Sequence, residues 1–418
     1  MHSLSRSRKG FRRLQGRWKP LAAAAVVAGS LALTAAGASA APAHVAAAPA
    51  DGTGPFDDSF YTPPSPLPAG KPGDVIRWRE SKAGPRKDSA SAWQVMYLST
   101  NALGQPDAVT GTVLVPKSAD PATAPIVAFA PGTHGPAFSC TPSAMMNIGA
   151  FYEQPGVDDL LDAGYAVAIT DYEGYQSDPK TTYVVGRSEG PAVIDSVRAA
   201  QRLAATKLSA TSKVLFRGYS QGGGAAAWAG QLQPDYAPEL NLVGVAAGGI
   251  PADLVQVTLQ LDGKFGFGVF AYALIGLDRA YPELKLDSFL SDNGRAKLAE
   301  MQKSACTFEL LTTYANQKIG DYTTSAGYVK PAWVARLNEN KLGAAPIKVP
   351  VFEYHATGDQ LVQFKQADTL HKAYCTAGVK VTWKTYDTDH ITLVYTGNAD
   401  VLAFIKDRIA GTPATSNC

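Results

Sequence analysis

The chain has 418 residues, of which 46% are hydrophobic, and its 38 basic and 36 acidic residues nearly balance. Seven of the basic residues lie within the first 20 positions, and without them 31 basic residues face 36 acidic ones. A mildly acidic chain of this kind lacks the positive charge that binds nucleic acid or an anionic membrane surface, so we expect neither partner.

The first 40 residues have the pattern of an export signal. A basic stretch over 1–20 without any acidic residue precedes an apolar run over 21–36, and the small residues Ala-Ser-Ala follow at 38–40. A retained membrane anchor is the alternative, but the run is short and rich in alanine, whereas a span needs roughly 20 strongly apolar residues. We therefore expect a signal peptide over 1–40, a secreted protein, and no integral membrane segment after cleavage.

The rest of the chain divides into a tail and a catalytic domain. Residues 41–75 are rich in alanine, proline, glycine and aspartate without an apolar period, which predicts a flexible N-terminal segment. Over 76–418, short β-type runs alternate with helical patterns, which is typical of an α/β fold with a mostly parallel sheet flanked by helices. We expect a first antiparallel pair of strands, followed by buried strands with near-continuous apolar runs. The expected strands are 91–100, 108–116, 125–131, 165–172, 213–220, 242–249, 349–356 and 379–386.

One connection is too long for a simple crossover. Nearly a hundred residues separate the strand that ends near Gly249 from the strand that starts at Val349, and a structureless loop of that length is improbable. We expect an inserted helical cap over about 250–340. The uncharged run over 265–277 fits either a buried core helix or the wall of an apolar site. The candidates for an acyl-binding wall are Phe265, Phe267, Gly268, Phe270 and Tyr272.

A Gly-Tyr-Ser-Gln-Gly pentapeptide over 218–222 carries the sharpest chemical signal. It follows an apolar strand and precedes a helix-forming run, which is the context of a nucleophile elbow. In such an elbow the backbone is strained and the flanking glycines let strand and helix approach closely. This predicts that Ser220 is the nucleophile of a serine hydrolase with the α/β-hydrolase fold.

A serine hydroxyl needs a general base, and in this fold an acid and then a histidine follow the nucleophile in the chain. Three histidines lie beyond Ser220. His355 lies in an apolar strand and His371 on a helical stretch, so these two are typical of core or surface histidines. His390 follows the last predicted strand in a polar loop, and we expect it to be the base.

Three aspartates compete for the role of the acid. Asp359 comes just after the carboxyl end of the strand 349–356, from where a carboxylate can reach the imidazole and fix its tautomer. Asp387 and Asp389 flank His390, but near neighbours in a loop tend to cap or solvate the chain. We therefore expect Asp359 to be the acid.

The oxyanion hole requires two backbone donors beside the serine. Gln221 supplies one, and the loop over 131–140 with its two glycines supplies the other, for which His134 is the best candidate. An ordinary tight loop is the alternative interpretation. The sequence has no HExxH pattern, no Cys/His cluster and no glycine-rich nucleotide loop, so we expect neither a metal nor a cofactor.

Four cysteines lie beyond the signal, and none is in a CxxC pattern. An even number in an exported chain favours two disulfides over a metal site or a catalytic thiol. Composition alone leaves all three pairings open. The four are Cys140, Cys306, Cys375 and Cys418.

From about residue 90 to the end, the chain resembles the secretory lipase family of the α/β-hydrolase superfamily. The resemblance rests on several blocks together, namely TDYEGY at 170–175, EGPAVIDSVRA at 189–199, GYSQGG at 218–223, YAPELNLVGVAAGGIP at 236–251 and GDQLV at 358–362. It implies the same triad as the motifs do, and a cap above an acyl tunnel.

The resemblance also implies how the cysteines pair, with Cys140 bonded to Cys306 and Cys375 bonded to Cys418. In a member of the family an acidic residue stands at the slot of His134 and a glycine at that of Gln221. A backbone donor tolerates both differences, whereas a side-chain role for His134 does not carry over.

These observations predict a secreted carboxylic ester hydrolase, a carboxylesterase or triacylglycerol lipase, that acts through an acyl-enzyme on acylglycerols or other lipid esters. A peptidase or amidase could use the same triad, but the apolar insertion offers few charges to hold a peptide terminus. A non-catalytic exported binding protein is the alternative from another class, and an intact triad argues against it.

Overall fold

The computed structural model describes residues 58–176 and 178–418. The predicted signal peptide and residues 41–57 lie outside this part of the chain. The predicted flexible segment 41–75 needs correction over its last part, because Tyr61 is buried and its hydroxyl bonds to Ser143 Oγ at 2.9 Å and to Gln94 Nε2 at 2.7 Å. Composition did not reveal this aromatic anchor.

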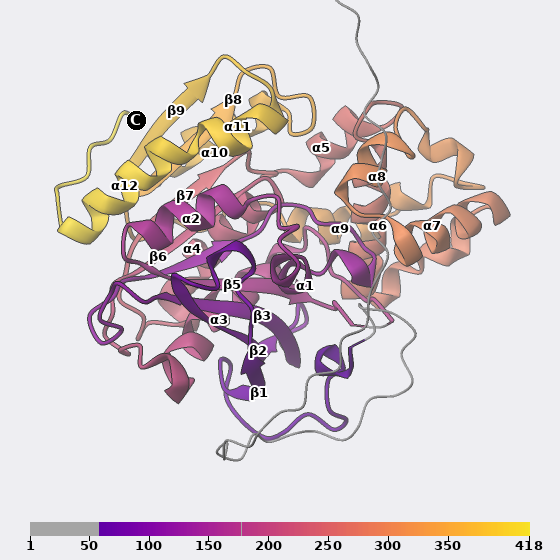
Figure 1. Ribbon diagram of the computed structural model, residues 1–418. Helices are drawn as coiled ribbons and strands as arrows, with labels where there is room; N and C mark the ends of the chain where they lie inside the picture. Colours follow the sequence, from indigo (N-terminus) through magenta and orange to yellow (C-terminus); the bar gives the residue numbers. More distant parts are fainter. Residues whose placement is uncertain (1–57, 177) are drawn as a thin grey trace, which may run out of the picture. The chain divides into compact units, whose positions relative to one another are not determined.

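A nine-stranded sheet forms the centre of the described chain, in the order β1-β2-β3-β5-β4-β6-β7-β8-β9 (Figure 1). The pairs along β1, β2, β3 and β5 are antiparallel, and all the others are parallel. The strands are β1 (Val75–Glu80), β2 (Ala90–Thr100), β3 (Pro106–Pro116), β4 (Ile126–Ala130), β5 (Ala166–Glu173), β6 (Val214–Tyr219), β7 (Leu242–Gly248), β8 (Val351–Ala356) and β9 (Val381–Tyr386). The predicted mostly parallel sheet is confirmed.

Eight of these strands lie at the predicted places, and β1 was not predicted. It is an edge strand that pairs only with β2 among the described strands, and its side chains are half-buried or exposed. Its sequence Val-Ile-Arg-Trp-Arg-Glu lacks the continuous apolar run that marks the buried strands. A strand exposed in this way gives a weaker pattern.

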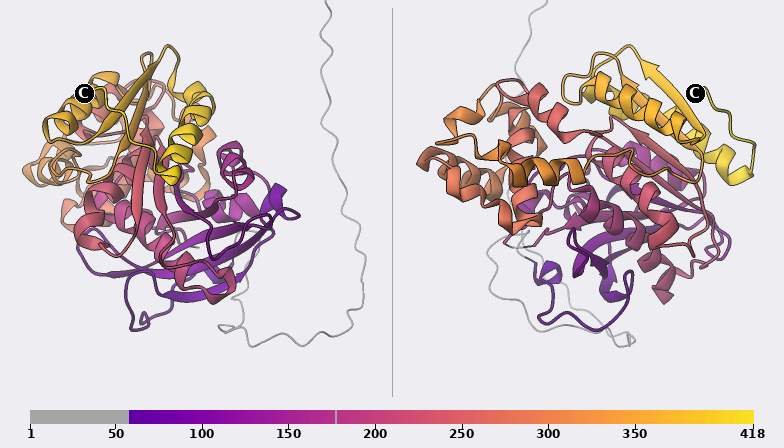
Figure 2. Two further views of the ribbon diagram at one scale, coloured as in Figure 1. Left: turned by 90° about the vertical axis from the view of Figure 1, so that its left-hand side faces the viewer. Right: turned by 180° about the vertical axis from the view of Figure 1, so that it is seen from behind.

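Helices cover both faces of the sheet, and alternate residues of each strand explain why (Figure 2). On β4, Ile126 and Ala128 pack into one core with α3, α4 and α10, whereas Val127 and Phe129 pack into a second core with α2, α11 and α12. The helices outside the insertion are α1 (Pro142–Asn147), α2 (Gln154–Asp162), α3 (Gly186–Arg202), α4 (Gln221–Tyr236), α10 (Phe364–Thr376), α11 (His390–Thr396) and α12 (Asn398–Ala410).

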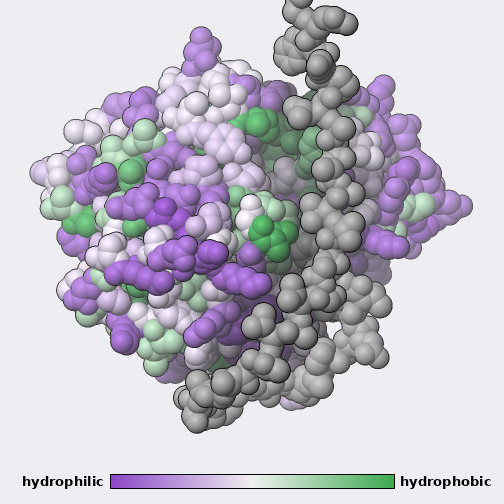
Figure 3. All heavy atoms as spheres, viewed as in Figure 1, coloured by the Kyte–Doolittle hydropathy of each residue, from purple (hydrophilic) through white to green (hydrophobic). Residues whose placement is uncertain are grey.

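Five α-helices lie between β7 and β8 and gather at one end of the sheet (Figure 1). They bury an apolar cluster of their own, which includes Phe267, Tyr322 and Trp333. Their outer face is polar: Figure 3 shows hydrophilic residues at the right-hand edge, where Figure 1 places α7. The five helices are α5 (Leu254–Leu261), α6 (Phe267–Ala280), α7 (Asp292–Ser304), α8 (Thr307–Thr312) and α9 (Pro331–Glu339).

Candidate active site

Three residues that are far apart in the sequence meet beyond the carboxyl ends of the parallel strands. Ser220 follows β6, Asp359 follows β8, and His390 is the first residue of α11 after β9. His390 Nε2 lies 2.9 Å from Ser220 Oγ, and His390 Nδ1 lies 2.6 Å from Asp359 Oδ2. The structure thus brings together the predicted nucleophile, base and acid within hydrogen-bond reach.

The backbone at Ser220 is strained. Its φ of 59° and ψ of −123° lie outside the regions that L-residues usually adopt. The turn is possible because its flanks have no side chains: a Cβ at Gly218 would lie 2.1 Å from the Gly222 carbonyl oxygen, and one at Gly222 would lie 1.9 Å from the Ala130 carbonyl oxygen. The strained turn raises the serine hydroxyl between the end of β6 and the start of α4.

Hydrogen bonds hold the backbone of His390 on both sides. Its N–H donates to Gln360 Oε1 at 3.0 Å, and its carbonyl accepts from the Tyr219 hydroxyl at 2.9 Å. Asp389 caps α11 by accepting from the backbone N–H groups of Ile391 and Thr392. Asp389 therefore starts the helix that carries the histidine and does not orient its ring.

The carboxylate of Asp359 is buried and fully bonded. Oδ1 accepts from the N–H groups of Leu361 at 2.9 Å and Val362 at 2.7 Å, and Oδ2 faces His390 Nδ1. Burial alone would raise the pKa of Asp359, but the charge of His390 and the hydrogen bonds of His355 and His390 hold that pKa well below its ordinary value. Asp359 is thus an anion that can stabilise an imidazolium. Asp387, the other aspartate considered for the acid, is exposed.

The loop that follows β4 is fixed from several sides. The Gly132 N–H donates to Glu153 Oε2 at 2.7 Å, Thr133 Oγ1 bonds to the Tyr183 hydroxyl at 2.7 Å, and the His134 carbonyl accepts from the Thr307 N–H at 2.9 Å. Thr133 and His134 both border the cavity at Ser220. Sequence reasoning did not single out Thr133, because its neighbour gave the stronger chemical signal.

The His134 side chain offers no free N–H donor. Its Nδ1 lies 3.0 Å from the Gly132 carbonyl oxygen and must carry the hydrogen, because a carbonyl only accepts. Burial lowers the pKa of His134 to about 4, so the ring is neutral, and it stacks against the rings of both Phe151 and Tyr152. Nε2 is buried with no hydrogen-bond partner among the described residues. Only the backbone of this residue can serve an oxyanion.

Gln221 begins α4, where backbone N–H groups are left free by the helix. Its side-chain amide is held by a buried carboxyl: Nε2 donates to Glu189 Oε1 at 2.7 Å, and the same oxygen accepts from the Val184 N–H at 2.9 Å. Burial raises the pKa of Glu189 to about 8 and that of Glu153 to about 7. Two buried carboxyls therefore support the two sides of the predicted oxyanion hole.

An apolar cavity of about 410 Å³ opens at Ser220 and His390. None of the described residues that line it is acidic, lysine or arginine. The wall away from Ser220 and His390 comes chiefly from α5 and α6, so the insertion and these two residues border the same cavity. The apolar wall residues from these two helices are Leu254, Val257, Leu261, Val269, Phe270, Ala273, Leu274 and Leu277.

A sequence model of the family described as "Secretory lipase" matches residues 141–417. The chain belongs to the secretory lipase family. As a member, the protein is a secreted serine hydrolase with the α/β-hydrolase fold, and it hydrolyses lipid esters.

Relatives of this secretory lipase match over most of its length. It is 31% identical to the secreted triacylglycerol lipase LIP1 of Malassezia furfur, over 87% of this chain and 77% of that protein. It is 31% identical to lipase 6 of Candida albicans, over 87% of this chain and 83% of that protein. The X-ray structure of Candida antarctica lipase A superposes with a TM-score of 0.77 at 27% identity, over 87% of this chain and 88% of that chain.

The predicted acyl wall of the secretory lipase needs correction, because of five candidates only Phe270 lines the cavity. Phe267 is buried within the insertion's apolar cluster, and Tyr272 is buried against Tyr183. Phe265 is exposed, and a Cβ at Gly268 would lie 2.2 Å from the Leu310 carbonyl oxygen. The candidates were chosen for aromatic rings and glycines. A helix presents one face, which here holds Val269, Phe270, Ala273, Leu274 and Leu277.

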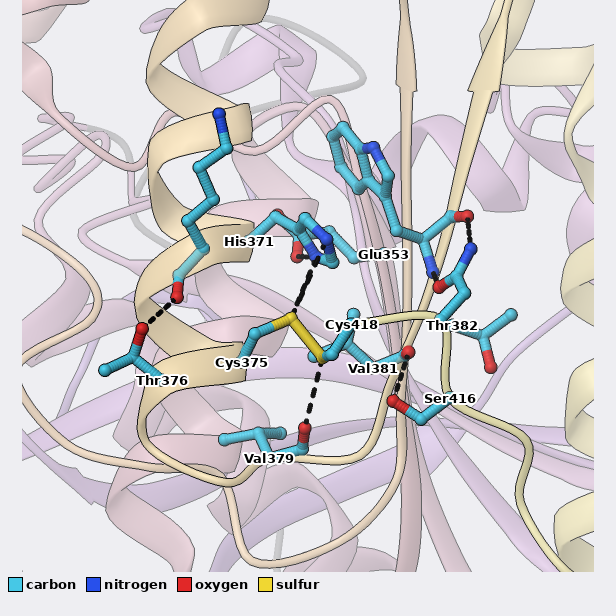
Figure 4. Close-up of a disulfide and its surroundings, with 12 residues drawn as sticks. Glu353, His371, Cys375, Thr376, Val379, Val381, Thr382, Ser416 and Cys418 are labelled. Atoms are coloured by element: carbon cyan, nitrogen blue, oxygen red, sulfur yellow. Dashed lines mark hydrogen bonds and ion pairs between the residues drawn. A yellow bond between two sulfur atoms is a disulfide. The ribbon is translucent and has the colours of Figure 1, made fainter.

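Both disulfides of the secretory lipase are formed, with the pairing that the resemblance implied. Cys140 is bonded to Cys306, which ties the segment after the β4 loop to the start of α8. Cys375 on α10 is bonded to Cys418, and Figure 4 shows His371 and Glu353 beside this bridge. Among residues 58–176 and 178–418 no cluster of metal-ligating side chains occurs, and no helix there has the length and hydropathy to cross a membrane.

Proposed function

We propose that this secretory lipase cleaves its ester through a triad of Ser220, His390 and Asp359 and a covalent acyl-enzyme. The observation that carries the proposal is the continuous chain of hydrogen bonds from Ser220 Oγ through both ring nitrogens of His390 to Asp359 Oδ2. A carboxylate on Nδ1 keeps the hydrogen there, so that the lone pair of Nε2 faces the serine hydroxyl.

The reaction has two halves with the same proton carrier. Ser220 Oγ bonds to the ester carbonyl carbon while its proton passes to His390 Nε2; the tetrahedral intermediate then collapses, and the alcohol leaves with that proton. Water next attacks the acyl-enzyme, gives its proton to His390, and the carboxylic acid leaves as Ser220 regains the proton. Asp359 stays ionised throughout, which its low pKa supports.

We assign the oxyanion hole to backbone N–H groups. One is that of Gln221 at the start of the 16-residue helix α4, where the helix dipole also favours negative charge. The other comes from the Thr133–His134 stretch, which borders the cavity opposite. Charge on the carbonyl oxygen develops only in the transition state, so these donors raise kcat more than they lower KM.

The proposed substrate is an ester with an apolar acyl chain, such as an acylglycerol. The uncharged lining supports it, because a peptide substrate would bring polar backbone groups that such a wall leaves unpaired. In this proposal α5 to α9 act as the cap of a catalytic domain that begins near residue 76. The segment 1–40 acts as a signal peptide that is removed on export.

Replacement of the nucleophile tests the proposal. We expect Ser220→Ala to lower kcat on p-nitrophenyl butyrate and emulsified tributyrin by on the order of 10⁴ to 10⁶, with an unchanged circular dichroism spectrum. Ser304→Ala, an exposed serine on α7, is the matched control and should keep the wild-type rate. If purified Ser220→Ala retained more than a hundredth of the wild-type rate, the triad would be wrong.

A further inference from the structure

A second histidine touches the proposed acid. His355 lies on β8, is completely buried, and places its Nε2 at 3.3 Å from Asp359 Oδ2. This is the same carboxylate oxygen that faces His390 Nδ1 at 2.6 Å. The sequence pattern, an apolar strand, predicted only a core histidine here, and the reaction as described above gives this side chain no task.

The hydrogen bonds of His355 define which ring nitrogen carries the hydrogen. Nε2 also lies 2.8 Å from the Val362 carbonyl oxygen, and a carbonyl only accepts, so Nε2 is the donor. Nδ1 is buried without a partner among the described residues, so a hydrogen placed there would be an unpaired donor. The pattern fits a ring whose Nε2–H donates to Val362 O, with Asp359 Oδ2 3.3 Å from the same nitrogen.

His355 therefore contacts both ends of the short loop that carries the acid. Inside the loop, Asp359 Oδ1 accepts from the N–H groups of Leu361 and Val362, which fixes one oxygen. Gly358 N–H, which donates to Thr388 O, and Gln360 Oε1, which accepts from His390 N–H, tie the loop to the segment before α11, and His355 adds the tie to β8 itself. A carboxylate displaced by a fraction of an ångström would lose the bond that orients His390.

We propose that His355 is a positioning residue, whose Nε2–H anchors the loop 359–362 on β8 and keeps Asp359 Oδ2 directed at His390. The proposal rests on the triad proposed above. His355 does not touch the serine or the ester carbonyl, so it acts only through Asp359. Because Asp359 is buried, each N–H group that bonds to its carboxylate contributes to stability, and an unpaired carboxylate oxygen in that environment is costly.

Three substitutions separate positioning from mere packing. His355→Leu keeps the bulk but removes the donor, and we expect kcat on p-nitrophenyl butyrate to fall about 10- to 100-fold, as for loss of a hydrogen bond to a charged group, with KM changed less than about twofold. His355→Gln places an amide donor near the position of Nε2 and should recover most of kcat. His355→Asn places its donor one methylene short and should not.

A double-substitution cycle then tests whether His355 works through the acid. In an Asp359→Asn background, His355→Leu should lower the remaining kcat by less than about threefold, because the bond to the carboxylate is already gone. His371→Leu, a histidine on α10 that stacks on Trp383 and does not touch Asp359, is the matched control and should keep the wild-type kcat. Thermal unfolding of each variant records the packing cost separately.

Each of these measurements supports or overturns the proposed role of His355. The proposal is overturned if His355→Leu keeps the wild-type kcat, or if His355→Leu lowers kcat equally in the wild-type and Asp359→Asn backgrounds. It is also overturned if His355→Gln and His355→Asn lose the same kcat and the loss follows the drop in Tm. If the Leu variant does not fold, the contrast between Gln and Asn still decides. An active Asp359→Asn would instead refute the proposed triad, so the two failures are distinguishable.

Discussion

Two regions border Ser220, the proposed nucleophile, and they are built in different ways. The loops at the carboxyl ends of β6 and β8 and the start of α11 hold Ser220, Asp359 and His390 by directed hydrogen bonds of 2.6 to 3.0 Å. The insertion over α5 to α9 presents an apolar wall held by packing. Catalysis needs a few polar atoms in defined places, whereas an acyl chain needs only a dry surface of suitable shape.

The comparison is sharpest at the acid. Asp359→Asn should lower kcat by on the order of 10⁴, because the amide can hold the wrong tautomer of His390. Asp387→Asn, an exposed aspartate three residues before the histidine, should change kcat less than about threefold. Steady-state kinetics on p-nitrophenyl butyrate measure both, and a larger loss in the Asp387 variant would move the acid to the other loop.

The insertion should affect the choice of substrate and leave the chemistry intact. Ala273 lines the cavity from α6, so Ala273→Phe fills space that a long acyl chain would occupy. Each buried methylene contributes roughly 0.8 kcal/mol, so loss of room for four carbons should lower kcat/KM on octanoate about 100-fold relative to butyrate. Leu259→Phe on the exposed side of α5 is the control. Equal losses on all chain lengths would mean that this wall is plain core.

One buried carboxyl on β8 lacks directed hydrogen bonds to the described residues, and we expect it to affect stability alone. Glu353 on β8 is completely buried, and neither carboxyl oxygen has a hydrogen-bond partner among the described residues. His371 Nδ1 lies 3.8 Å away, beside the Cys375–Cys418 bridge (Figure 4). Burial, followed by the charge of Asp368, raises the pKa of Glu353 well above its ordinary value of 4.5, so folding favours the protonated form of this carboxyl.

The sign of its pH dependence follows from linkage. A carboxyl whose pKa is higher in the folded state contributes stability that is fully present below its unfolded pKa, and this contribution is lost as the pH rises through the folded pKa. A methionine at position 353 does not titrate. Above about pH 4.5 the free energy of unfolding of Glu353→Met should therefore rise relative to that of the wild type, by up to about 1.4 kcal/mol per pH unit. Urea unfolding at pH 4, 6 and 8 measures the difference. A difference that stays constant with pH would mean that Glu353 is solvated or paired.

The sequence could single out Ser220, Asp359 and His390 as candidates because their signals are local, and the structure places the three side chains within hydrogen-bond reach. A strand, a glycine-flanked serine and a helix define the elbow within a dozen residues, and Asp359 and His390 follow strands with buried patterns. It failed for the acyl wall, because which face of α6 meets the cavity depends on the helices packed behind it. It also gave no signal for the contact between His355 and Asp359, which arises only when the loop 359–362 folds back. The signal peptide over 1–40 stays a prediction.

The most direct test of the account is covalent capture of the nucleophile. An alkyl p-nitrophenyl phosphonate mimics the tetrahedral intermediate and stays bonded to the attacking oxygen. We predict the release of one p-nitrophenolate per chain, loss of activity in step with labelling, and a single adduct on the peptide that contains Ser220, with no adduct in Ser220→Ala. An adduct on another residue, or full labelling with activity retained, would contradict the account.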